Sequence, residues 1–250
     1  MTWGIQFKSK EEPTAPDPQP LPKLPAWSYS RYAKWQKCPR SAFYAFVARR
    51  PEPQSPEMAR GITAHNEAAR ILTGEECNPM ILTRQWVDRL SQIKGMFGDN
   101  IEAELQQGFT KDWEPTGWFA KDVWCRVVFD GFAVLPTNNA AIHVYEHKTG
   151  KVRAEHIAQV GLYAVAAQAA LPESGDRDVV VTLNYLDVPP DSTMSMQTYV
   201  IRAKEIPTLR GMWNDRIAPM MNDTEFPATP GTHCKWCAFS KNNGGDCDRG

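Results

Sequence analysis

Two apolar segments that each contain an acidic residue constrain the fold most strongly. Residues 123–134 (VWCRVVFDGFAV) and 141–147 (AIHVYEH) are rich in β-branched and aromatic residues, and a turn-forming stretch with one Pro and two Asn separates them. This pattern predicts a β-hairpin. Asp130 and Glu146 lie inside these strands beside hydrophobic neighbours. Since a charge in such a place is normally paired or metal-bound, the hairpin also predicts a polar site.

Lys148 adds a cation to this pair of acids. Glu146 and Lys148 are two residues apart, so they project from the same face of a strand, and an antiparallel hairpin can bring Asp130 beside them. Two carboxylates hold Mg²⁺ or Mn²⁺ through oxygen. The cation activates water, and the lysine orients that water or stabilises phosphate charge. The cluster therefore predicts phosphodiester cleavage, although an Asp and a Glu-x-Lys pair also occur at solvated strand ends.

Three further residues fit such a site. His65 lies on a helix predicted over 57–72, and Gln159 and Tyr163 lie four residues apart, on one face of a helix predicted over 155–170. Each alone has a structural interpretation, as a core histidine, a solvated glutamine or a half-buried tyrosine. Their occurrence together and in order supports the functional interpretation.

The remaining pattern alternates helices and strands behind a proline-rich start. Residues 11–26 hold six prolines, so 1–26 is expected to be a flexible leader. Further helices are predicted over 28–38, 41–48, 86–97 and 203–221, and further strands over 179–188 and 196–201. The chain has no run of about 18 apolar residues and no secretory signal, so we expect a cytoplasmic protein without a membrane span.

Four of the six cysteines have metal-binding spacing. Cys234 and Cys237 form a CxxC, Cys247 follows after nine residues, and Cys38 lies far upstream. Four thiolates suit a tetrahedral zinc or an iron–sulfur cluster, and the spacing does not separate the two. His233 is an alternative ligand, and Trp236 is expected to pack over the metal. Cys125 fits a core position, and Cys77 has no assigned role.

Net charge does not identify the partner, because 28 basic and 29 acidic residues leave −1. Residues 31–50, however, contain six basic residues, no acidic residue, and interleaved aromatic rings that can stack on bases. The predicted DNA contacts are Arg31, Lys34, Lys37 and Arg40. The alternative is a pair of amphipathic helices with ordinary solvated charges.

The ordered set of motifs resembles the RecB/Cas4-like branch of the PD-(D/E)xK nuclease superfamily. The matching stretches, in chain order, are SYSRYAKWQKCPRSAFYAF, RGITAHNEA, VVFDGFAV, YEHKTG and QVGLYAVA, followed by the late cysteines. The resemblance implies an α/β (α+β) fold, with a restriction-endonuclease-like mixed sheet flanked by helices. It also implies one domain over 27–250, with a helical section at 27–115, a catalytic core at 116–222 and a Cys-rich tail at 223–250.

The resemblance further implies residue roles. His65, Asp130, Glu146 and the main-chain carbonyl of His147 would bind Mg²⁺ or Mn²⁺, and Lys148 would be the catalytic lysine. Gln159 and Tyr163 would support the site and contact the DNA backbone. A structural [4Fe-4S] cluster would be held by Cys38, Cys234, Cys237 and Cys247, although the spacing before Cys247 is longer than the family's usual one. Glu102 or Glu104 could supply another acid, but both are expected on a solvated helix face.

The implied function is metal-dependent DNA hydrolysis, as an exonuclease on DNA ends or single strands. One alternative is a non-catalytic or partner-dependent DNA-binding subunit of a recombination, repair or spacer-acquisition complex. Another is a zinc-ribbon protein with a coincidental Glu-x-Lys pair. The small size and the absence of a Walker A loop favour a stand-alone enzyme, as a virus or mobile element would encode.

Overall fold

A six-stranded mixed sheet organises the chain in the computed structural model, which describes residues 21–137, 140–174 and 177–249. The strand order is β2-β1-β3-β4-β5-β6; β4 and β5 are parallel, and the other neighbours are antiparallel. The mixed α/β fold expected from the sequence is therefore confirmed. The strands are β1 (Ile101–Phe109), β2 (Pro115–Thr116), β3 (Cys125–Val134), β4 (Ile142–Lys148), β5 (Val179–Tyr185) and β6 (Met196–Ile201).

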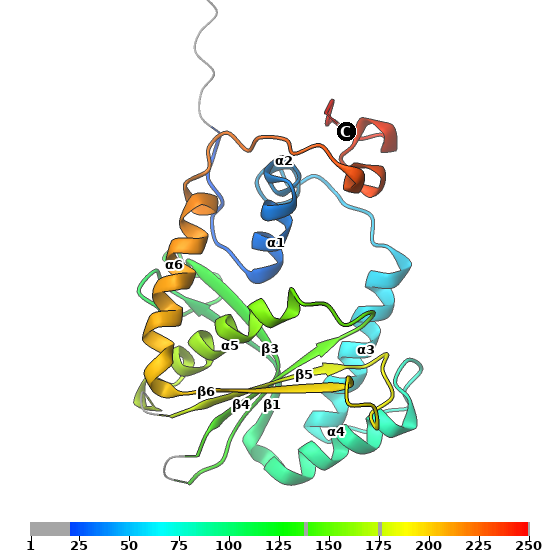
Figure 1. Cartoon of the computed structure of the whole chain (residues 1–250), viewed down its shortest axis with the longest axis vertical. Helices are drawn as coiled ribbons and strands as arrows, with labels where there is room; N and C mark the ends of the chain where they lie inside the picture. The colour runs from blue at the N-terminus through cyan, green and yellow to red at the C-terminus, as the bar shows by residue number, and fades with distance from the viewer. Residues whose placement is uncertain (1–20, 138–139, 175–176, 250) are drawn as a thin grey trace, which may run out of the picture.

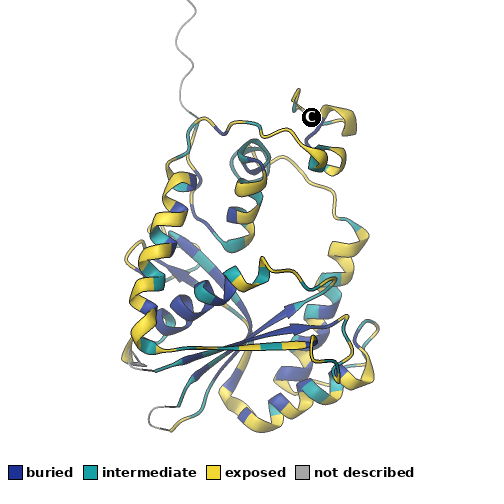
Figure 2. Ribbon diagram, viewed as in Figure 1, coloured by how far each residue is buried: buried dark blue, intermediate teal, exposed yellow. Residues whose placement is uncertain are grey.

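Helices cover both faces of this sheet (Figure 1). One hydrophobic core joins α3 and α4 to one face, and a larger core joins α5, α6 and α1 to the other. In Figure 2 the central strands are buried, whereas the outer sides of α4 and α6 are exposed. None of the helices in the described part is both long and apolar enough to cross a membrane. The helices are α1 (Tyr29–Lys37), α2 (Pro39–Ala42), α3 (Pro56–Thr73), α4 (Arg84–Phe97), α5 (His156–Ala170) and α6 (Ile206–Asn222).

Local sequence fixes the two helices that face the site. Ser55 caps α3 by accepting a hydrogen bond from the Met58 N–H, and Gly74 ends the helix in the left-handed region with φ 80°. Helix α5 is apolar on nearly all sides and is almost wholly buried between the sheet and α6. These anchors place His65 on α3 and Gln159 on α5 at the same end of the sheet.

The section between 27 and 115 differs from the helical section expected. It contains β1, because Ile101–Phe109 pairs along its length with β3 rather than forming a solvated helix. Residues 1–20 of the predicted leader lie outside the described residues. Its last residues are packed rather than flexible: Leu24 and Ala26 are buried, and the Leu21 N–H donates to the Thr224 carbonyl at 2.9 Å.

Two other boundaries also differ. The helix expected over 41–48 is α2 followed by a π-helical turn at Phe43–Val47, which together cover Pro39 to Val47. The strand expected over 179–188 ends at Tyr185, where the Leu186 N–H donates to the Lys148 carbonyl at 2.8 Å and the chain leaves the sheet.

A buried glutamate two residues after His65, Glu67, fastens α3 to the loop before α4. The Glu67 carboxylate accepts hydrogen bonds from the backbone N–H groups of Met80, Ile81 and Leu82, at 2.6–3.2 Å. We expect Glu67→Ala to lower the free energy of unfolding by about 2 kcal/mol, because three backbone donors, of which that of Leu82 is buried, lose their acceptor. Urea denaturation measures this loss. Glu67→Gln, which keeps one oxygen, should lose clearly less; equal losses would contradict the assignment.

Candidate active site and metal centre

The sheet opens where the acidic residues lie. The β3–β4 ladder runs from Val134–Ile142 to Gly131–Tyr145, so Asp130 and Glu146 lie just past its last pair. On the other side of β3, the regular pairs with β1 skip Glu104 opposite Asp130. Glu104 has φ 53°, a backbone conformation that is costly for a non-glycine residue and frequent at functional sites. The local distortion turns these carboxylates toward one another.

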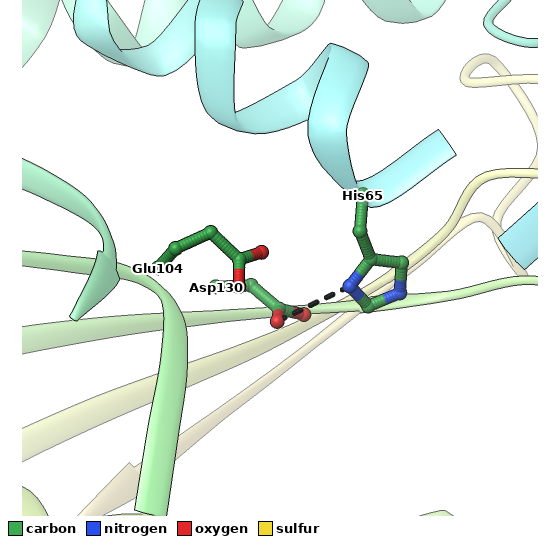
Figure 3. A group of neighbouring side chains, drawn as sticks. All are labelled: His65, Glu104 and Asp130. Atoms are coloured by element: carbon green, nitrogen blue, oxygen red, sulfur yellow. Dashed lines mark hydrogen bonds and ion pairs between the residues drawn. The ribbon is translucent and has the colours of Figure 1, made fainter. Parts of the chain in front are cut away.

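His65, Glu104 and Asp130 form a compact group of donors (Figure 3). One ligand atom from each lies within 4.8 Å of the others. The His65 Nδ1 is 3.2 Å from Asp130 Oδ1, and Asp130 Oδ2 accepts a hydrogen bond from the His147 N–H at 2.6 Å. The expected helix face is wrong for both Glu102 and Glu104, because both lie on strand β1, although both are exposed as expected. Glu104 lies next to the predicted ligands, whereas Glu102 is not part of this group.

Lys148 joins this group to α5. Its Nζ donates to Glu146 Oε1 at 2.5 Å and makes a second short hydrogen bond to Gln159 Oε1. Tyr163 is buried on the same helix and lines the same cleft as Glu146. The structure thus brings together Lys148, Glu146, Gln159 and Tyr163, as the sequence predicted.

Burial controls the charges of this cluster. Burial and the negative charge of Asp130 raise the pKa of Glu146 to about 7, against the lowering effect of Lys148. For Asp130, burial raises the pKa, but the hydrogen bond and charge of His65 outweigh it and leave the pKa below its usual value. Burial lowers the pKa of His147 to about 4, so its ring is neutral at pH 7. The acids thus lie where an added positive charge would be strongly favoured.

These residues fit a divalent cation. The donor atoms are carboxylate oxygens and one imidazole nitrogen, the types that Mg²⁺ and Mn²⁺ accept. In addition, Glu146 Oε2 is buried near the Tyr163 side chain, and the ion pair of this carboxylate with Lys148 is made by Oε1; a cation at Oε2 would be favourable. The main-chain carbonyl of His147 stays a predicted ligand.

A cleft of about 730 Å³ leads to the carboxylates. Its wall comes from the start of α1, from α3, from β3 and from α5. Two guanidinium groups, Arg31 and Arg126, face the same space. The cleft therefore combines a metal-type acidic centre with cations that can bind phosphate.

Comparison with known proteins agrees with this geometry. The model of the PD-(D/E)XK nuclease superfamily matches residues 26–241. The chain belongs to this superfamily. A solved structure described as "Crystal structure of SSO0001" is similar, at 16% identity, with a TM-score of 0.43 and coverage of 88% of this chain and 86% of that chain. No curated protein gives a significant match.

The basic residues predicted to bind DNA do not form one surface in this PD-(D/E)XK protein. Arg31 lines the cleft, its guanidinium donating to the Ala26 carbonyl at 2.8 Å. Lys34 is paired with Glu52 at 2.7 Å. Lys37 is exposed near the end of α1, and Arg40 lies beside the cysteines. Only Arg31 is therefore close to the metal-type centre.

Most of the aromatic rings in 31–50 are engaged inside the protein. Tyr32 packs edge-on against Trp213, and Trp35 donates to Asp223 at 2.8 Å. Phe43, Tyr44 and Phe46 likewise contact Phe226, Phe239 and Arg31. Only Tyr32 among these rings is buried, and the others are half-buried. The contacts favour the packing interpretation, and base stacking by these rings stays a prediction. The expected packing of Trp236 over the metal is wrong, since this side chain is 81% exposed.

The four predicted cysteine ligands surround one small cavity between α2 and the tail. Cys38, Cys234, Cys237 and Cys247 all line it, and so does His233. Backbone N–H groups point at two of the sulfurs: Thr229 donates to Cys38 and Gly231 to Cys234, at 3.5 and 3.4 Å. His233 Nε2 is buried and unpartnered among the described residues, so the histidine stays an alternative ligand.

The extra residues before Cys247 form a closed turn. Lys241 donates its N–H to the Cys247 carbonyl at 3.0 Å, and Cys247 donates to the Phe239 carbonyl at 2.8 Å. Gly245 allows this return, because a Cβ there would lie only 2.3 Å from the Phe239 backbone. The unusual spacing therefore still delivers Cys247 to the cavity. Cys125, by contrast, is fully buried in the core, as expected.

Glu102 and Glu104 offer a matched test of the metal centre. We expect Glu104→Gln to weaken Mn²⁺ binding about tenfold, because one anionic donor is lost, comparable to removing an outer-shell partner. Glu102→Gln, on the same strand but outside the donor group, should leave the affinity within about twofold. Isothermal titration of EDTA-treated protein with Mn²⁺ measures both. Equal affinities of the two variants would place Glu104 outside the site.

Proposed function

We propose that the protein is a divalent-metal-dependent DNA nuclease of the RecB/Cas4-like branch, an exonuclease acting on DNA ends or single strands. The observation that carries the proposal is the His65–Glu104–Asp130 donor group beside the Glu146–Lys148 pair in a chain of the PD-(D/E)XK superfamily. The branch and the preference for ends rest on the ordered motifs from Cys38 to Cys247. Arg31 in the cleft supports an anionic polymer as substrate.

Each residue of the site has a separate role in the proposed hydrolysis. His65, Glu104, Asp130 and Glu146 would hold the divalent cation, which would polarise the scissile phosphate and lower the pKa of a bound water. Gln159 and Glu146 hold the Lys148 ammonium at the cleft floor, so that its remaining proton can reach a phosphate oxygen. The backbone N–H of His147 fixes the orientation of Asp130. Tyr163, buried beside Glu146, closes that side of the site against water.

The direct test is DNA cleavage with a matched inactive variant. Wild-type protein with Mn²⁺ or Mg²⁺ should degrade end-labelled linear DNA, and Lys148→Ala should be slower by about 100-fold or more because transition-state charge loses its stabilising cation. Closed circular DNA, single- and double-stranded, separates the two modes of attack. Circles that survive support an exonuclease, and circles that are cut show an endonuclease.

Absence of DNA cleavage by the wild-type protein would change the proposed function. Wild-type protein that binds but does not cut any of these DNAs, with binding unchanged in Lys148→Ala, would favour the non-catalytic, partner-dependent subunit. EDTA is the control for metal dependence: cleavage that persists in EDTA and in Lys148→Ala would reveal a contaminant.

We further propose that the cysteine cavity holds a structural [4Fe-4S] cluster. Cys38, Cys234, Cys237 and Cys247 line one cavity, and four thiolates suit a tetrahedral zinc or an iron–sulfur cluster. The resemblance to the RecB/Cas4-like branch favours the cluster. The cluster would tie the tail to Cys38, at the junction of α1 and α2.

Metal analysis of anaerobically purified protein tests the cluster. We expect about four irons per chain and a brown chromophore in the wild type, with loss of most of both in Cys247→Ser, since the fourth ligand is removed. Cys77→Ser is the matched control, because Cys77 lies outside the cavity, and it should keep the full iron content. One zinc per chain and no iron would overturn the proposal.

A further inference from the structure

An aromatic and cationic corner at the rim of the active-site cleft has no role in the chemistry proposed above. It lies in the loop between β2 and β3, at Trp118 and Phe119, and includes Arg126 on β3. The Phe119 side chain is 86% exposed. Burial of such a ring would stabilise the fold by roughly 2 kcal/mol, and this exposed ring does not contribute that free energy. Core packing therefore does not explain the residue.

The loop that presents these rings is ordered by its own contacts. The Ala120 N–H donates to the Gly117 carbonyl at 3.0 Å, which closes a turn with Trp118 and Phe119 at its tip. Thr116 Oγ1 donates to Asp122 Oδ1 at 3.0 Å across the base of the loop. The rings are therefore held in place before any ligand arrives, which lowers the entropic cost of binding.

Arg126 joins the rings to the cleft. Its Nε donates to the Trp118 carbonyl at 2.8 Å, and its guanidinium carbon lies 5.6 Å from the Trp118 ring centre and 5.7 Å from that of Phe119. Arg126 and Trp118 line the same cleft as Asp130 and Glu146. The corner is thus continuous with the proposed catalytic centre.

The corner also carries uncompensated positive charge. Arg31 and Arg126 line the same cleft, and burial together with the charges of Arg126 and Arg49 lowers the pKa of Arg31. Within the described part of the chain, the ion pairs include none of these three arginines. Cations gathered without acidic partners are complementary to phosphates.

We propose that Trp118 and Phe119 form a stacking platform for unpaired bases of a DNA strand whose phosphates bind Arg126 and Arg31. The inference rests on the proposed nuclease function and specifies its substrate: a single-stranded end led past the rim into the cleft. Exposed rings beside arginines bind single strands because every base has a π-face, and they cannot reach bases that are stacked in a duplex. The platform thus selects an unpaired strand independently of its sequence.

Binding without cleavage tests the platform. The affinities of a short thymidine oligonucleotide and of an abasic strand of equal length are measured by fluorescence anisotropy in EDTA, where the metal-dependent reaction is off. Wild-type protein should bind the thymidine strand on the order of tenfold more tightly, because only that strand has bases to stack. Phe119→Ala should reduce this preference to about twofold or less, and its affinity for the abasic strand should stay unchanged.

Trp236→Ala is the matched control. Trp236 is a similarly exposed aromatic residue, 81% exposed, on the tail rather than at the cleft rim. This variant should keep the full preference for the thymidine strand. Loss of the preference in both variants, or in neither, would overturn the platform.

The outcomes also separate this inference from the nuclease proposal. A wild-type protein that binds the two strands equally contradicts base stacking, even if it cleaves DNA in Mn²⁺. A protein with the expected preference that never cleaves supports the platform and contradicts the nuclease.

Discussion

Burying two carboxylates inside a sheet is the constraint on which the rest of this structure depends. Asp130 and Glu146 are only 6% and 5% exposed, and each needs compensation that apolar strands cannot give. It comes from three directions: His65 on the helix over one face, Lys148 two residues further along β4, and the backbone N–H of His147. Since these groups approach from both faces, the strands must part at this end of the sheet. The opening that satisfies the charges is also the cleft.

The hairpin and helices α3 and α5 could be predicted because their patterns agree with their surroundings. Strand β1 could not: IEAELQQGF consists largely of good helix formers, and only pairing with β3 makes it a strand. The role of Glu104 was hidden for the same reason. Its carboxylate reaches His65 through a positive φ that no residue pattern reveals. Asp130 and Glu146 were thus predictable, because they follow the regular alternation of their strands. Glu104 was not, because the backbone of β1 departs from that alternation at this residue.

The segment 31–50 shows a second limit of sequence patterns. Basic and aromatic residues at helical spacing suit a DNA-binding face and a buried helix pair equally well. The choice depends on what packs against them, here the tail at Phe226 and Phe239, about two hundred residues later in the chain. Trp118, which is half-buried and lines the cleft, and the exposed Phe119 beside it lie in a short loop without periodicity, where no sequence pattern marks them.

The distance along the chain between Cys38 and the other cavity cysteines has a consequence for biosynthesis. Cys38 is made early, but its partners follow only after the entire sheet, at positions 234, 237 and 247. The sheet and its two layers of helices can therefore form first, whereas the cavity stays incomplete until the tail has emerged and returned to α2. Until then the Cys38 thiol lacks the other three cysteines of the cavity. A metal group held by all four cysteines, as proposed, would therefore be inserted last, and its presence would show that the chain has been made at least as far as Cys247.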